Sequence, residues 1–78
     1  MNLEYIQYNM QEIQEEIELI LKGIKRGENY AHDEYYKSMQ HLIHHVNIAW
    51  NTRNATTEEI ESHDLSYWSQ FPTDINLI

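Results

Sequence analysis

Cysteine is absent from the 78 residues of this chain, which excludes disulfide bonds, thiolate metal sites and a thiol nucleophile. The only glycines are Gly23 and Gly27, so no glycine-rich loop is available to hold a phosphate group. Long apolar runs are also missing, and Leu19-Ile20-Leu21 is far too short to cross a membrane. Residues 1–4 lack the charged and apolar pattern of a signal peptide. We therefore expect a cytoplasmic protein that does not enter membranes.

Basic residues are scarce, because five lysines and arginines stand against 13 aspartates and glutamates and give a net charge of −8. Residues 1–21 and 58–64 contain acids but no base, whereas Lys22, Lys25 and Arg26 form a single basic cluster. An acidic surface repels the phosphate backbone, so direct binding of nucleic acid is not expected.

The apolar content nevertheless predicts a folded chain. Apolar residues make up 41% and aromatic residues 12% of the sequence, which is too much for a disordered acidic tail. We expect one domain over residues 1–78. A core of this size contributes only about 3–5 kcal/mol to stability, so additional support from a homodimer is expected.

The first apolar pattern predicts a helix over residues 3–25. Its apolar residues alternate at spacings of three and four: Leu3, Ile6, Met10, Ile13, Ile17, Ile20 and Ile24. This periodicity places them on one face of a helix. Gly27 suits a left-handed helix end, and Gly23 either costs about 1 kcal/mol relative to alanine or allows an early fray of the helix or the close approach of another helix. The predicted core or dimer stripe consists of Ile6, Met10, Ile13, Ile17 and Ile20. Replacing Ile13 or Ile17 with aspartate is expected to disrupt the fold or the dimer.

A second helix is predicted over residues 30–53, with Asn29 as its N-cap. Its apolar face is wider and contains Tyr35, Tyr36, Met39, Leu42, Ile43, Val46, Ala49 and Trp50. A face of this width can contact two neighbours, so this helix is expected to be the most buried element. The connector at 27–29 is so short that the two helices must run antiparallel.

The remainder predicts a short helix over residues 57–63 and an ordered tail over residues 64–78. Thr56 and Glu59 have the spacing of a capping box. The complete prediction is an all-α fold in which an antiparallel helical hairpin, a short third helix and the tail dimerise into a four-helix bundle.

His41 and His45 are the candidate metal ligands, because a spacing of four places two imidazoles on one helical face. The alternative is that they lie half-buried beside an apolar stripe. The Glu-x-x-His and His-Glu-x-x-His patterns are both missing, and no cofactor is predicted. Imidazoles near an acidic surface also suggest an assembly that responds to mildly acidic pH.

A second candidate site combines amides, an arginine and large aromatics, which are common in protein-binding surfaces and ligand pockets. Its residues are Trp50, Asn51, Arg53 and Trp68. The alternative is that the two tryptophans anchor the tail. No serine lies in a recognisable nucleophile turn, so an enzyme is not expected. We predict a protein–protein interaction or regulatory module that acts through its helical faces or through its acidic surface, which would suit a partner with a basic surface. Two alternatives stay open: a metal- or ligand-binding bundle that uses His41 and His45 or the Trp50 region, and an acidic mimic of nucleic acid.

Overall fold

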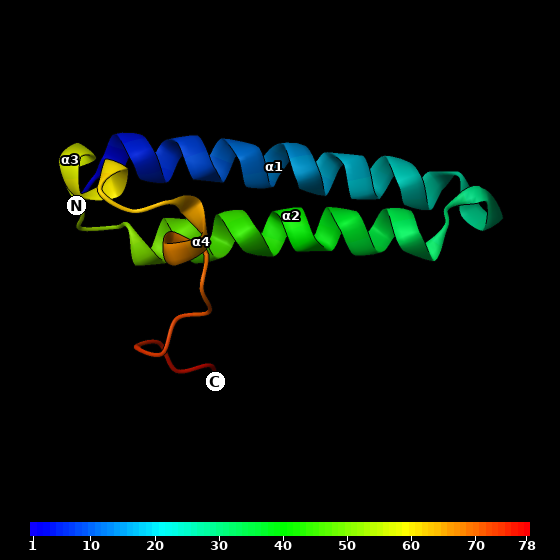
Figure 1. The fold of residues 1–78 in the computed structure, drawn as a ribbon. Helices are drawn as coiled ribbons and strands as arrows, with labels where there is room; N and C mark the ends of the chain where they lie inside the picture. Colours follow the sequence, from blue (N-terminus) through cyan, green and yellow to red (C-terminus); the bar gives the residue numbers. More distant parts are fainter.

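The computed structural model describes all 78 residues and contains only helical elements (Figure 1). In chain order these are α1 (Leu3–Lys25), η1 (Gly27–Asn29, a 3-10 turn), α2 (His32–Asn51), α3 (Thr57–Glu61) and α4 (Leu65–Trp68). The two long helices pack side by side and antiparallel, while the C-terminal tail leaves the hairpin next to α2 (Figure 1). The predicted all-α helical hairpin is therefore confirmed.

The start of α1 is tied to the end of α2 through Asn2. As N-cap, the Asn2 side chain accepts a hydrogen bond from the Tyr5 amide at 3.2 Å. Its backbone N–H donates to the Arg53 carbonyl at 2.7 Å, and its side-chain amide donates to the Ala55 carbonyl at 2.9 Å. The predicted bounds of this helix are confirmed, and Gly27 adopts the expected left-handed conformation with a φ of 62°.

The second helix begins at His32 rather than at residue 30, so the prediction of Asn29 as its N-cap is wrong. Asn29 belongs to η1, and Tyr30 and Ala31 are extended before α2 starts. This path places the Tyr30 ring against Gly23, where the Cβ of any other residue would overlap it. Gly23 therefore makes room for this ring rather than for a neighbouring helix.

The C-terminal bounds of α2 and α3 also differ slightly from the predictions. α2 ends at Asn51, two residues early, where the Thr52 hydroxyl donates to the Ile48 carbonyl at 2.6 Å. α3 has the predicted capping box but ends at Glu61 rather than at residue 63, and the Ser62 hydroxyl donates to the backbone at this end. α4 lies inside the region predicted as tail.

The hairpin buries few residues. Eight residues are buried, α2 contains half of them, and only Ile48 and Ala49 are hydrophobic. The radius of gyration is 14.4 Å, against about 11.5 Å for a compact domain of this length. The accessible surface of 6194 Å² exceeds by roughly 1,100 Å² the area usual for a folded monomer of this mass. The fold therefore exposes more surface than a compact monomer does, and many large hydrophobic side chains contribute to it.

No helix combines the length and apolar character that a membrane crossing requires.

Candidate interaction site

Polar residues occupy the centre of the contact between α1 and α2, which we call the seam. The Nδ1 atom of His45 lies 2.9 Å from the Asn9 side-chain oxygen, and both residues are buried. The Nδ1 atom of His41 lies 2.9 Å from a carboxylate oxygen of Glu16, which is also buried. Because the Asn9 amide nitrogen donates to the Tyr5 carbonyl, its oxygen accepts from a His45 that carries the proton on Nδ1.

This polar seam divides the predicted stripe of α1 into two rows. Ile6, Ile13 and Ile20 are partly buried beside the seam. The other row follows the seam residues Asn2, Asn9, Glu16 and Gly23 by one position and contains Leu3, Met10, Ile17 and Ile24. Their exposed fractions are 65%, 49%, 44% and 57%, respectively. Four of the seven residues of the apolar stripe therefore remain open to water.

A matching row on α2 lies on the same side of the hairpin. Met39, Leu42 and Val46 each follow a residue on the seam side of α2 by one position, and Val46 is 44% exposed. One position corresponds to a rotation of about 100° around a helix. In an antiparallel pair, this rotation carries both rows to the same side. We call the combined surface the apolar face, which consists of Leu3, Met10, Ile17, Ile24, Met39, Leu42 and Val46.

The structure brings the two predicted metal ligands together. The ring centroids of His41 and His45 lie 4.9 Å apart, and His44 is adjacent to both. Their Nδ1 atoms face Glu16 and Asn9, respectively. No group of three or more histidines, aspartates or glutamates is placed to hold a metal ion. Burial lowers the pKa of His45, and the neighbouring His41 and His44 lower it further, against the opposing effect of Glu12 and Glu16.

We expect this lowered pKa to make the protein less stable in mild acid. The unfolded chain, in which a histidine has a pKa of about 6.5, binds more protons there than the folded chain does. The contribution of His45 to stability is therefore complete above about pH 6.5 and is lost as the pH falls through its folded-state pKa. In urea unfolding, the free energy of unfolding should decrease less between about pH 7 and pH 5 for His45→Gln than for the wild type. The exposed His63 provides the control, and an equal decrease in His45→Gln and His63→Gln would contradict the prediction.

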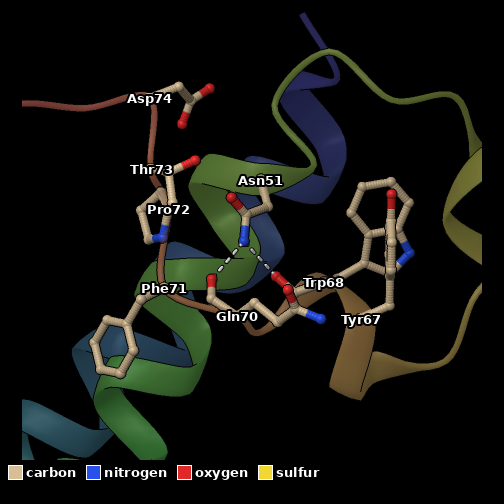
Figure 2. A pocket seen from close by; sticks show the side chains of 8 residues that line it. All are labelled: Asn51, Tyr67, Trp68, Gln70, Phe71, Pro72, Thr73 and Asp74. Carbon is tan, nitrogen blue, oxygen red and sulfur yellow. Dashed lines mark hydrogen bonds between the residues drawn. The ribbon is translucent and has the colours of Figure 1, made fainter.

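The four residues of the second predicted site also lie near one another, and they contact the chain's own tail. The Asn51 amide donates to the carbonyls of Trp68 and Gln70 at 2.7 and 2.8 Å (Figure 2). The Trp50 indole donates to one carboxylate oxygen of Asp74 at 2.8 Å, and Arg53 donates to the other at 3.2 Å.

Further contacts join this site into one cluster. The Arg53 guanidinium lies 3.7 Å from the centre of the Trp50 ring. The Trp68 indole donates to the Ile60 carbonyl at 3.0 Å and so connects α4 to α3. The Trp50 hydrogen bond and, next, Arg53 help to hold the pKa of Asp74 below its usual value. Asp74 is not among the residues predicted from the sequence, although an acid in the tail is a natural partner for an arginine that has no acid near it in the chain.

A cleft of about 370 Å³ lies between the tail and the end of α2 (Figure 2). Its lining residues are Asn51, Tyr67, Trp68, Gln70, Phe71, Pro72, Thr73 and Asp74. Comparisons of the chain with protein-family models, with curated proteins and with solved structures find no match. Function must therefore be inferred from the surfaces described above.

Proposed function

We propose that this protein is a non-enzymatic protein–protein interaction module and that the apolar face is its binding surface. The observation that carries this proposal is the row of Leu3, Met10, Ile17 and Ile24, each at least 44% exposed and each seven residues from the next. Spacing of this kind is typical of a helix that packs against another helix. The partner that we propose is a second copy of the chain, so that two hairpins form a four-helix bundle.

The area of the hairpin supports a dimer. Each chain exposes roughly 1,100 Å² more than a compact monomer does, and a stable interface usually buries about 800 Å² on each partner. Small chains without disulfide bonds commonly gain their missing stability by oligomerisation. The surplus surface is therefore large enough for a dimer contact.

The distribution of charge supports the same surface. Gln14 and Leu21, which also lie on this side of α1, are uncharged. Glu4, Glu15 and Glu18 lie on the outer side of the helix, away from the seam. Two copies can therefore meet through their apolar faces without bringing these carboxylates together. In such a dimer the acidic outer side stays in solvent, where a partner with a basic surface would be attracted to it.

Sedimentation equilibrium of a matched pair of variants tests this proposal. Ile17→Lys places a charge in the apolar face, whereas Gln11→Lys places the same charge on the exposed outer side of α1. We expect the wild type and Gln11→Lys to be dimers, and Ile17→Lys to dimerise about 100-fold more weakly, because each contact would bury unpaired charges. A wild type that is monomeric at millimolar concentration, or equal dimerisation of the two variants, would overturn the proposal.

A further inference from the structure

The outer side of α2 holds the tail mainly through the tail's backbone. Asn51 donates to the carbonyls of Trp68 and Gln70, and Asn47 donates to the intervening carbonyl of Ser69 at 3.0 Å. Three consecutive carbonyls are thus bound by two side chains of one helix. Because every residue has a carbonyl, these contacts do not require a particular side chain in the bound segment.

One contact does select a side chain. Asp74 lies four residues beyond the last bound carbonyl, and its two carboxylate oxygens accept from different donors, the Trp50 indole and the Arg53 guanidinium. Arg53 also stacks on the Trp50 ring, which orients both donors toward the same carboxylate. A carboxylate at this position is therefore the chemical requirement of the surface.

The tail itself fills this surface poorly. Phe71 is 75% exposed, and Leu77 and Ile78 at the chain end are almost entirely exposed. The cleft beside Asn51 also remains open between the tail and α2 (Figure 2). The hydrogen bonds that hold Gln70 and Asp74 are solvent-exposed, and their small net contribution is opposed by the entropy of ordering the segment. The tail is therefore able to leave the surface.

We propose that Asn47, Trp50, Asn51 and Arg53 form a docking site for a peptide of another protein that presents three consecutive carbonyls from a turn, as residues 68–70 do, and that the chain's own tail occupies this site until it is displaced. The peptide carries an aspartate or glutamate four residues after the stretch whose carbonyls are bound. The site lies outside the apolar face, so this proposal does not depend on the proposed dimer.

The test uses the full chain, labelled with ¹⁵N, and an unlabelled synthetic peptide that copies residues 66–78. Asp74→Ala in the protein removes the carboxylate of the tail and frees Trp50 and Arg53. We expect the peptide to bind this variant at least about tenfold more tightly than the wild type, because competition from the tail is weakened. Binding should shift the indole N–H signal of Trp50 and the side-chain amide signals of Asn47 and Asn51.

Three comparisons make the test specific to this surface. A peptide with alanine in place of Asp74 should bind at least about tenfold more weakly, since the carboxylate accepts two hydrogen bonds, one of them from a cation. Adding Asn51→Ala to the Asp74→Ala protein should weaken binding similarly, whereas adding Asn29→Ala, an exposed asparagine in η1, should not. Equal binding of the two peptides would overturn the proposal.

Two further results would also overturn it. One is the absence of any Trp50 shift when millimolar peptide is added to the Asp74→Ala protein. The other is the same Trp50 shift when unlabelled wild-type protein is added to the labelled Asp74→Ala protein. The occupant of the site would then be the tail of a second copy rather than a peptide of another protein.

Discussion

Replacing Ile13 with aspartate is expected to unfold the protein, whereas the same replacement at Ile17 is expected to leave the hairpin folded. Ile13 is partly buried beside the seam, between the Asn9–His45 pair and the Glu16–His41 pair. An aspartate there would lose the apolar contact and place a second carboxylate near the buried Glu16. Each effect costs about 2–4 kcal/mol, which together exceeds the roughly 3–5 kcal/mol that a core of this size supplies.

Ile17 differs because it belongs to the apolar face and is 44% exposed within a single hairpin. An aspartate at this position remains in contact with water, so we expect Ile17→Asp to keep its helical circular dichroism while Ile13→Asp loses it. In the proposed dimer, Ile17→Asp should also become monomeric, with an unfolding midpoint that no longer depends on protein concentration. Equal loss of helix in both variants would mean that the seam and the apolar face do not differ in this way.

Replacing both Asn9 and His45 with leucine is expected to restore the stability that either single replacement removes. Asn9→Leu alone leaves the buried N–H of His45 without an acceptor, and His45→Leu alone leaves the Asn9 oxygen without its donor. Each single variant should therefore lose about 1–3 kcal/mol. The double variant has neither unpaired group and gains apolar contact, so its stability should equal or exceed that of the wild type.

Urea unfolding of the four proteins in this cycle measures the coupling between the two positions. We expect a coupling of at least about 2 kcal/mol. The matched control is the cycle of Arg26→Leu and Glu34→Leu, a half-exposed ion pair whose coupling should stay below about 1 kcal/mol. A coupling between Asn9 and His45 as small as that of the control would show that burial of the pair contributes little.

The local elements could be predicted because their signals are local. The apolar spacing and Gly27 determine α1, and the capping box of Thr56 and Glu59 determines where α3 begins. The start of α2 was less predictable. The ring of Tyr30 has to reach Gly23 before α2 can begin. This contact joins one residue before the turn to one residue after it, so the sequence of α2 alone does not indicate it.

The seam could not be predicted from the spacing of one helix alone. The apolar stripe suggests a contact centred between its two rows, but the hydrogen bonds of Asn9 with His45 and of Glu16 with His41 shift that centre toward the polar residues. These partners lie 36 and 25 residues apart in the sequence. Periodicity identifies the face of a helix that is apolar, and it does not identify which polar side chains will pair across the contact.

The candidate tail-docking site was predictable in its helical half only. Trp50, Asn51 and Arg53 are close together in the sequence and have an unusual composition, which is why they could be selected. Asp74 and the carbonyls of residues 68–70 come from the last residue of α4 and the irregular segment that follows it. Every residue has a main-chain carbonyl, so the sequence does not indicate which carbonyls are bound.

The specific contacts of α1 with the rest of the chain repeat every seven residues. Asn2 binds Arg53 and Ala55, Asn9 pairs with His45, Glu16 pairs with His41, and Gly23 receives the ring of Tyr30. A purely apolar contact would tolerate sliding of one helix along the other by a turn. Here a slip of one turn would break every one of these contacts at once. The hairpin is thereby restricted to a single register, and the insertion of one residue between Asn9 and Glu16 would put the pairs Asn9–His45 and Glu16–His41 out of step with each other.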